Sequence, residues 1–314
     1  MTKALTATEL DRTLEGSIGR HIEKIWDWDA FPASRGYPEL ARAQMRYIGS
    51  GGSPKTNDET TLAPTHFTTS LLYQDPDRYA AVHTHEIEEI FLVHEGRMVV
   101  SWDFDGEFVD IALGPGDALV NPADRAHGFR NDGPTPTVAQ FMVGHPKPMM
   151  PNYKSHPSKG GTAPEFRQPL PNPADPRVVE AHSYVVRGNQ APVYWHTLDN
   201  GSRLATQPYV LPVELNGVVP SIRFSLEFLY LPERVETLTY TFDHEVAFMV
   251  WDGQIAVEYL DGDGTADALL GKRDLVLVEP GQRFRLRSTG GATAKVSATL
   301  GTATPEPGRW TTAS

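Results

Sequence analysis

The chain has 314 residues, with 27 glycines, 26 prolines and no cysteine, and it carries a formal charge of −12 at neutral pH. This length allows two domains, while the lack of cysteine excludes disulfides, thiolate metal sites and a cysteine nucleophile. The negative charge disfavours nucleic-acid binding, because it repels a phosphate backbone. The sequence contains no apolar run typical of a signal peptide or a membrane span. We therefore expect a cytoplasmic protein that contacts neither nucleic acid nor a membrane.

Residues 6–25 have the clearest helical pattern of the chain. Apolar side chains recur there at spacings of three or four residues, at Leu10, Leu14, Ile18, Ile22 and Ile25. This periodicity predicts an amphipathic helix. Thr8 is a candidate cap, because its hydroxyl can accept a hydrogen bond from an unpaired backbone amide at the start of the helix.

Short apolar runs separated by turn sequences fill residues 67–143. The runs include FTTSLLY, EEIFLVHEG, MVVSWDFDG, VDIALGPGD and VAQFMV. Such spacing is typical of an antiparallel sandwich or barrel. Residues 145–176 then contain nine prolines and little apolar periodicity, which indicates a linker or a long surface loop. A second strand-rich stretch follows, from about residue 178 to residue 300.

The two strand-rich halves resemble each other in sequence. EEIFLVHEGRMVVSW (88–102) aligns with EVAFMVWDGQIAVEY (245–259), and LGPGDALV (113–120) aligns with LGKRDLVL (270–277). The repeat predicts two similar barrels. We expect an N-terminal helix and extended segment at 1–60, a first barrel at 61–147, a Pro-rich linker at 148–177 and a second barrel at 178–314.

Two histidines and a glutamate suggest a metal site in the first barrel. In a strand, side chains alternate between faces, so that His83, His85 and Glu89 would share one face. Burying two imidazoles and a carboxylate together is costly unless a cation is bound by them. Imidazole and carboxylate suit divalent transition metals. His127, which follows a Pro-containing turn, is the expected fourth ligand.

These residues resemble the two sequence motifs of the cupin superfamily. The first motif is G-x5-H-x-H-x3,4-E-x6-G, and the chain matches its spacing from His83 to Gly96, with Asp77 in place of the leading glycine. The second motif is G-x5-P-x-G-x2-H-x3-N. Gly116, Pro122, His127 and Asn131 match this second motif, and Asp124 takes the place of its inner glycine. Both departures fall in turns and leave the four ligand positions intact.

The resemblance implies an all-β fold of two cupin barrels, also called double-stranded β-helix or jelly-roll barrels, with an N-terminal helix. It also implies a metal held by His83, His85, Glu89 and His127, with coordination positions left for water, substrate or O2. We expect Fe(II), with Mn, Ni or Zn as other possible metals, and no organic cofactor.

The second barrel departs from the ligand pattern. On the alignment above, the positions of His83, His85 and Glu89 are taken by Tyr240, Phe242 and Val246, and the position of His127 falls near Phe284 or Arg285. His244 has the opposite strand parity and should face away from the centre of the barrel. We therefore expect a metal-free, structural second barrel.

Strand parity also suggests which residues line a substrate pocket. Phe129 shares a face with His127, and a following strand carries Gln140 and Met142 on one face. Trp102 is a further candidate, and Arg97 could bind an anionic group because a guanidinium binds a carboxylate through two hydrogen bonds. The predicted substrate-binding residues are Arg97, Trp102, Phe129, Gln140 and Met142.

The resemblance favours a metal-dependent dioxygenase that cleaves a C–C bond of a hydroxylated aromatic or enolisable carbonyl compound. Glu89 would be both a ligand and the base that takes a proton from the substrate. One alternative is a metal-dependent isomerase, decarboxylase or lyase, in which the metal acts as a Lewis acid. Another is a non-catalytic cupin that binds a small molecule. Because sheet edges need to be covered, we also expect a homodimer.

Overall fold

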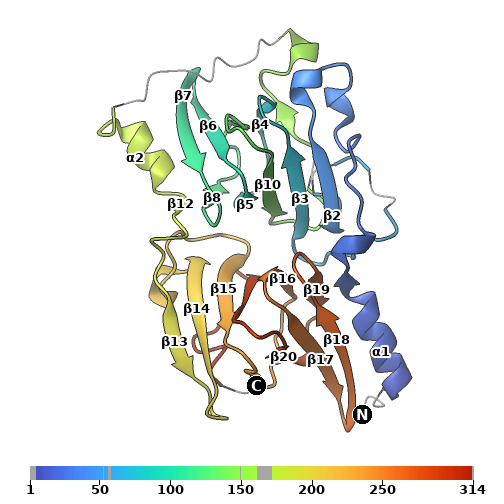
Figure 1. Cartoon of the computed structure of the whole chain (residues 1–314). Coiled ribbons are helices and arrows are strands. Elements are labelled where there is room, and N and C mark those ends of the chain that lie inside the picture. The colour runs from blue at the N-terminus through green and yellow to red at the C-terminus, as the bar shows by residue number, and fades with distance from the viewer. Residues whose placement is uncertain (1–4, 52, 56–57, 149, 161–171, 313–314) are drawn as a thin grey trace. The chain divides into compact units, whose positions relative to one another are not determined.

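The computed structural model describes residues 5–51, 53–55, 58–148, 150–160 and 172–312, which form two compact units (Figure 1). The unit of residues 25–190 is called the first barrel here. The unit that combines residues 1–24 with 191–314 is called the second barrel.

The first barrel consists of two antiparallel sheets and one short α-helix. Its elements are β2 (Ala43–Ile48), β3 (Thr68–Gln74), β4 (Tyr79–Thr84), β5 (Glu89–Glu95), β6 (Met98–Phe104), β7 (Glu107–Leu113), β8 (Ala118–Asn121), β9 (His127–Arg130), β10 (Thr137–Val143), β11 (Asn152–Tyr153), α2 (Pro176–His182) and β12 (Val185–Val186). The strand orders are β12-β8-β5-β10-β3-β2 and β11-β4-β9-β6-β7.

The core of the first barrel lies between its two sheets. Phe91 of β5 and Phe141 of β10 stack with their ring centroids 4.0 Å apart, and they belong to one buried cluster with Val100 of β6 and Ile111 of β7. On β7 the buried residues alternate with exposed ones, as expected for a sheet with one face in the core and one in solvent. Figure 1 shows α2 beside β7, at the edge of the second of these sheets.

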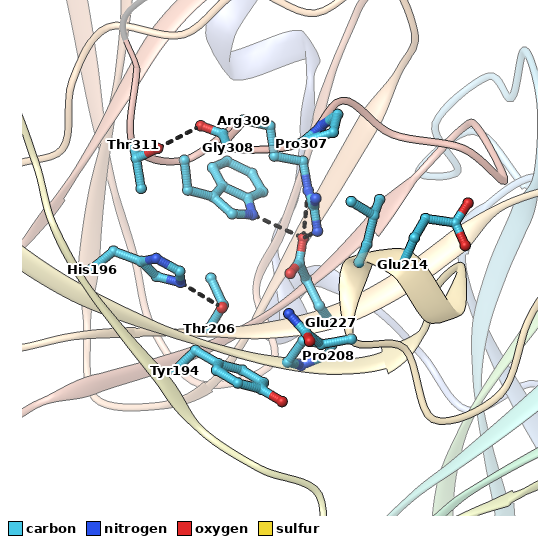
Figure 2. Close-up of a pocket in the computed structure, with 13 residues that line it drawn as sticks. Tyr194, His196, Thr206, Pro208, Glu214, Glu227, Pro307, Gly308, Arg309 and Thr311 are labelled. Carbon is cyan, nitrogen blue, oxygen red and sulfur yellow. Dashed lines mark hydrogen bonds and ion pairs between the residues drawn. The ribbon is translucent and has the colours of Figure 1, made fainter.

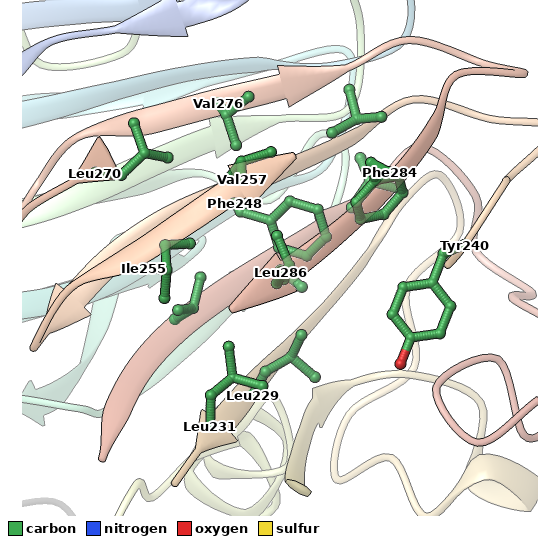
Figure 3. Packing of buried hydrophobic residues seen from close by; sticks show 14 of the residues in the cluster. Leu229, Leu231, Tyr240, Phe248, Ile255, Val257, Leu270, Val276, Phe284 and Leu286 are labelled. Atoms are coloured by element: carbon green, nitrogen blue, oxygen red, sulfur yellow. The ribbon is translucent and has the colours of Figure 1, made fainter. Parts of the chain in front are cut away.

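The second barrel repeats this plan. Its elements are α1 (Ala7–Gly16), β1 (Ile18–Gly19), β13 (Tyr194–Thr197), β14 (Arg203–Val210), β15 (Ser225–Leu231), β16 (Val246–Asp252), β17 (Ile255–Asp261), β18 (Gly264–Leu270), β19 (Leu275–Val278), β20 (Arg283–Ser288) and β21 (Ala294–Leu300). The strand orders are β1-β19-β16-β21-β15-β14-β13 and β18-β17-β20. Figure 3 shows the apolar side chains of this core, among them Phe248 and Phe284.

The strand pairing confirms the repeat that the sequence predicts. In the first barrel β5 lies between β8 and β10, and in the second barrel β16 lies between β19 and β21. The following turn is also matched, since Gly96 and Gly253 both have positive φ, at 76° and 75°. A Cβ atom at Gly96 would lie 2.3 Å from the carbonyl oxygen of Pro136, so this turn requires glycine.

The N-terminal helix is shorter than predicted. It ends at Gly16, and Ile18 belongs instead to β1, where it pairs with Val276 of β19. Ile22 and Ile25 are 91% and 76% exposed, so the predicted apolar stripe does not continue to residue 25. Glycine is a poor helix former, and pairing with the edge of a sheet satisfies the backbone beyond it.

The N-cap of this helix is Thr6 and not Thr8. The Thr6 hydroxyl accepts a hydrogen bond from the Glu9 amide, and the Glu9 carboxylate accepts one from the Thr6 amide. This reciprocal pair is a capping box, which a threonine followed three residues later by a glutamate favours. Figure 1 shows the capped helix beside β18.

The units are divided at places other than those expected from the sequence. The expected N-terminal segment, 1–60, is shared between them: of its described residues, those at 5–24 belong to the second barrel and those from 25 onward to the first. Part of the expected linker, 148–177, is structured, because Asn152 and Tyr153 pair with β4 and Pro176 begins α2. Residues 161–171 of that segment lie outside the described residues. Within the described part of the chain, no helix is long and apolar enough to cross a membrane.

Candidate metal centre

Four buried side chains of the first barrel meet at one point. His83, His85, Glu89 and His127 each offer one ligand atom, and these atoms lie within 4.8 Å of one another. Their exposed fractions are between 1% and 6%. Among the described residues this is the one group of three or more potential ligands. All four are the residues that the sequence motifs predict.

The four ligands do not come together in the way that strand parity predicts. His83, His85 and Glu89 do not lie on one strand, because β4 ends at Thr84 and β5 begins at Glu89. His85 is in the turn between the two strands. His83 is instead brought to His127 by pairing between β4 and β9. Three strands, β4 and β9 of one sheet and β5 of the other, together with the turn between β4 and β5, therefore supply the ligands.

Backbone carbonyl groups orient two of the imidazoles. Nδ1 of His83 lies 2.7 Å from the oxygen of Ala81, and Nδ1 of His127 lies 2.9 Å from the oxygen of Arg125. A carbonyl oxygen accepts hydrogen bonds and cannot donate them, so Nδ1 carries the proton in both rings. In a neutral ring Nε2 then offers a lone pair, which is the arrangement found in histidines that bind metals.

The contacts of Glu89 fit a bound cation. Its Oε2 atom lies 3.3 Å from Nε2 of His127 and 3.5 Å from Nε2 of His85. A carboxylate oxygen and an unprotonated nitrogen repel each other at such distances unless a proton or a cation lies between them. Nδ1 of His85 is buried and has no hydrogen-bond partner among the described residues. Three imidazoles and one carboxylate are a suitable donor set for a divalent transition metal.

Burial also keeps the histidines in the form that binds metal. It lowers the pKa of His83 well below the usual 6.5, and the neighbouring His127 and His85 lower it further. Burial lowers the pKa of His85 as well, although Glu89 acts in the opposite direction. Both rings are therefore neutral at neutral pH and available as ligands.

The two turns in which the motif glycines are replaced keep a glycine-like backbone. Asp77 and Asp124 have φ values of 58° and 61°, in the left-handed region. Aspartate adopts this region more readily than most residues that carry a Cβ. The amide of Asp124 also donates to the carbonyl oxygen of His85 at 2.7 Å, which ties this turn to the ligand loop.

A small cavity of about 20 Å³, called the metal cavity here, lies beside the ligands. A space of this size holds about one water molecule. Its lining consists of Phe31, Arg42, Gln44, Gly51, Leu72, His83, His85, Glu89, Phe129, Phe141 and Pro151.

Of the five predicted substrate-binding residues, Phe129 lines the metal cavity. Trp102 is fully buried in the core beside His127, its partner across β6 and β9, and its indole donates a hydrogen bond to Asn121. Arg97 lies in the turn after β5, where it is exposed and forms an ion pair with Asp132. Trp102 and Arg97 are therefore not part of the lining.

The structure places Gln140 and Met142 away from the metal cavity. Gln140 pairs with Leu92 across β10 and β5, and Met142 pairs with Ile90. Paired residues of antiparallel strands point to the same face, and this face is opposite to that of Phe91 and Glu89. The residue of β10 that lines the metal cavity is Phe141, which lies between them in the sequence.

Sequence reasoning did not find Arg42, a buried cation at the metal cavity. Its side chain is 5% exposed, and it lies just before β2. Burial lowers the pKa of this guanidinium, while the nearby Tyr153 and Glu89 act in the opposite direction. No motif includes Arg42, and its closeness to Glu89 depends on how the segment before β2 folds.

In the second barrel the four ligand positions are taken by residues that do not bind metal. Tyr240 pairs with Phe284 as His83 pairs with His127, so the uncertain position of the alignment is Phe284. Val246 is the first residue of β16, as Glu89 is of β5. The aligned equivalent of His85 is Phe242. Figure 3 shows Tyr240 and Phe284 among the core side chains of this barrel.

Trp310 fills the corresponding space of the second barrel. It is 3% exposed, and its ring centroid lies 5.3 Å from that of Tyr240, 5.4 Å from that of Phe242 and 6.0 Å from that of Phe248. Its indole nitrogen donates to the buried carboxylate of Glu227 at 2.8 Å. Because an indole and aromatic rings occupy this space, the described residues offer no group of metal ligands in the second barrel.

A pocket of about 260 Å³ remains open beside Trp310. Figure 2 shows its polar side chains already engaged with each other: Arg309 with Glu227, and His196 with Thr206. Thr206 pairs with Leu229 as Gln44 of the first barrel pairs with Leu72. Thr206 therefore holds at this pocket the strand position that Gln44 holds at the metal cavity, whereas the residues aligned with the four ligands do not line the pocket.

Comparison with known proteins gives the family of the first barrel and the fold of the chain. Residues 71–144 match the family model described as a cupin domain. A comparison with curated protein sequences gave no match.

Three similar structures cover most of the chain. Salicylate 1,2-dioxygenase from Pseudaminobacter salicylatoxidans is 18% identical, with a TM-score of 0.58, over 96% of this chain and 84% of that chain. A mutant oxalate decarboxylase from Bacillus subtilis is 11% identical, with a TM-score of 0.59, over 84% and 74%. The vicilin of Solanum melongena is 10% identical, with a TM-score of 0.61, over 93% and 86%. At these identities the likeness shows a shared fold and not a shared activity.

Proposed function

Since the chain belongs to the cupin superfamily and has the two-barrel fold of the bicupins, we propose that it is a metal-dependent oxygenase. The metal would be Fe(II), held by His83, His85, Glu89 and His127. The reaction would be the cleavage by O2 of a C–C bond in a hydroxylated aromatic or enolisable carbonyl compound.

The observation that carries this proposal is the buried ligand group beside the metal cavity. Three imidazoles and one carboxylate share a point that is almost closed to solvent. Iron bound by such a set would supply one-electron chemistry toward O2 and a positive charge that favours an ionised substrate. The residues around it restrict water, since the metal cavity has room for about one molecule.

Glu89 is the candidate base of this site. Its carboxylate lines the metal cavity and lies within 3.5 Å of two imidazole nitrogens. A carboxylate at this position can accept the proton that a phenol or an enol loses on binding. Phe129 and Phe141 provide the apolar lining against which a planar substrate would pack.

The similar structures give the fold and do not favour one reaction. One of them is named as a dioxygenase and another as a decarboxylase. Non-redox chemistry, in which Mn, Ni or Zn polarises a carbonyl group, is therefore the alternative. The ligand set serves both reactions, so the metal and the use of O2 have to be measured.

The test is elemental analysis of the chain purified without oxygen, together with O2 uptake over a panel of phenols and diketones. We expect about one Fe per chain and uptake that depends on the substrate. Zn, Ni or Mn without uptake would favour the non-redox alternative. The absence of any metal would contradict the assignment of the four ligands.

Two histidine variants provide a matched comparison. His85→Ala should remove tight metal binding and activity, because it deletes one of four ligands. His244→Ala should leave both unchanged, because His244 lies in the second barrel, where it contacts Asp243 and stacks against Phe242. Loss of the metal in the His244 variant would contradict a single site in the first barrel.

A further inference from the structure

A second pocket of the first barrel lies next to the metal cavity. It has a volume of about 280 Å³ and is called the outer pocket here. Its lining comes from one segment and consists of Trp28, Phe31, Ser34, Arg35, Gly36, Tyr37, Pro38, Ala41 and Arg42. Phe31 and Arg42 also line the metal cavity. These two side chains therefore form a wall that the two spaces share.

The shared wall is held together by a cation–π contact. The guanidinium carbon of Arg42 lies 4.1 Å from the centroid of the Phe31 ring. The same guanidinium donates to the carbonyl oxygen of Leu40 at 3.1 Å and to the hydroxyl of Ser34 at 3.2 Å. These partners are neutral, and among the described residues no carboxylate forms an ion pair with Arg42. Glu89, which also lines the metal cavity, attracts this guanidinium although the two form no ion pair, and burial makes such a weakly compensated cation costly, so an incoming anion would be bound favourably.

The charge of the outer pocket is opposite to that of the whole chain. Its lining includes two guanidinium groups and no carboxylate, although the chain has a formal charge of −12. Arg35 is already engaged, because its Nε donates to Asp29 at 2.6 Å. Arg42 is therefore the cation that remains available to an anionic ligand.

Three aromatic side chains of the outer pocket suit a planar ring. Trp28 is 54% exposed, and its indole meets Tyr73 edge-on at 5.7 Å between centroids, which restricts its orientation. Phe31 and Tyr37 complete the aromatic part of the lining. Aromatic faces beside an available guanidinium favour a ligand that is both planar and negatively charged.

The volumes decide where such a ligand fits. A cavity that binds benzene has a volume of roughly 150 Å³. The outer pocket exceeds this value at about 280 Å³, whereas the metal cavity, at about 20 Å³, is far too small. An aromatic ligand can thus occupy the outer pocket of this structure, but it can reach the ligands of the metal only after the shared wall has moved.

We propose that the outer pocket binds a small aromatic carboxylate and that the Phe31–Arg42 wall is what this ligand displaces to reach the metal cavity. The proposal deepens the proposed function and rests on it for the destination of the ligand. Binding of the carboxylate by Arg42 would replace the neutral partners of the guanidinium and draw it away from Phe31.

The first test measures binding to the metal-free full chain by titration calorimetry. Benzoate should bind, and benzamide, which has the same shape without the charge, should bind more weakly by about tenfold or more. Arg42→Gln should remove this preference for the anion. Arg35→Gln is the matched control and should keep it, because Arg35 is already paired with Asp29. No binding of benzoate, or equal binding of benzoate and benzamide to the parent chain, would overturn the proposal.

A second test addresses the wall. The rate at which dipicolinate removes bound Zn(II) should rise about tenfold or more in Phe31→Ala, because the metal cavity would open into the outer pocket. Tyr37→Phe should not change this rate, since Tyr37 lines the outer pocket alone. Equal rates for the parent chain and Phe31→Ala would overturn the assignment of the wall.

The outcomes separate this proposal from the proposed function. Binding of benzoate that depends on Arg42, without O2 uptake on any substrate, would support the outer pocket and contradict the oxygenase. Uptake of O2 with substrates that lack a carboxylate, unchanged in Arg42→Gln, would support the oxygenase and contradict the outer pocket.

Discussion

Replacing Trp310 tests whether the second barrel depends on its own C-terminal segment to fill its interior. Trp310 is 3% exposed and contacts three aromatic rings, so that Trp310→Ala would leave a large apolar cavity. Substitutions of this kind cost about 3–5 kcal/mol. Loss of the hydrogen bond to Glu227 adds about 1 kcal/mol, although Arg309 continues to neutralise that carboxylate.

The expected total is therefore at least about 4 kcal/mol, which is a large part of the stability of an ordinary domain. Urea unfolding and calorimetry should show a lower midpoint for the transition of the second barrel, by roughly 10 °C on heating. Trp310→Phe keeps a ring in the space and should cost less. Added indole should partly restore the alanine variant, because an apolar cavity binds apolar ligands.

A loss of stability under about 1 kcal/mol in Trp310→Ala would refute this reasoning, since it would mean that the indole is not part of a packed core. The metal content of the chain is a useful control. It should stay at the parent value, because the ligand group belongs to the first barrel.

Three further predictions concern other parts of the structure. In urea titrations, Gly96→Ala should lower the free energy of unfolding more than Gly253→Ala. Both residues have positive φ, so both variants are strained. The Cβ added at residue 96 would also lie 2.3 Å from the Pro136 oxygen, whereas the closest contact at residue 253 is 3.0 Å. Glu89→Gln should weaken metal binding by more than roughly 10- to 100-fold, which is the usual effect of removing a residue that only hydrogen-bonds to a ligand. A competition titration against a chelator measures this affinity, and an unchanged value would exclude Glu89 as a ligand. Burial lowers the pKa of His196 in the folded chain below the 6.5 of the unfolded chain. As the pH drops below 6.5 the unfolded chain therefore binds more protons than the folded one, and the free energy of unfolding falls. His196→Gln should reduce this fall when unfolding is compared at about pH 7 and about pH 5.

The sequence predicts most of what depends on local spacing. His83, His85 and Glu89 were found because their spacing matches the first cupin motif, even though the single strand inferred from their parity does not exist. The two motif positions with aspartate in place of glycine kept the backbone that glycine favours, because Asp77 and Asp124 tolerate positive φ.

What the sequence did not predict comes from contacts between distant segments. Trp310 meets Glu227 across 83 residues, and Arg42 reaches the metal cavity from a segment without regular periodicity. The face of Gln140 was missed for a related reason: parity gives two possible faces, and the pairing of β10 with β5 decides between them. The homodimer and the cytoplasmic location stay predictions.

The division of the chain between its units has a consequence for synthesis on the ribosome. Residues 25–190 are contiguous, so the first barrel can fold as soon as this stretch has emerged, in line with the tendency of domains to fold in order of synthesis. The helix α1 is made earlier but has to wait for its neighbours β17 and β18. The Leu5 amide, for example, donates to Asp261, which is added 256 residues later. Until then the apolar face of α1, with Leu10 and Leu14, has no native surface to cover it.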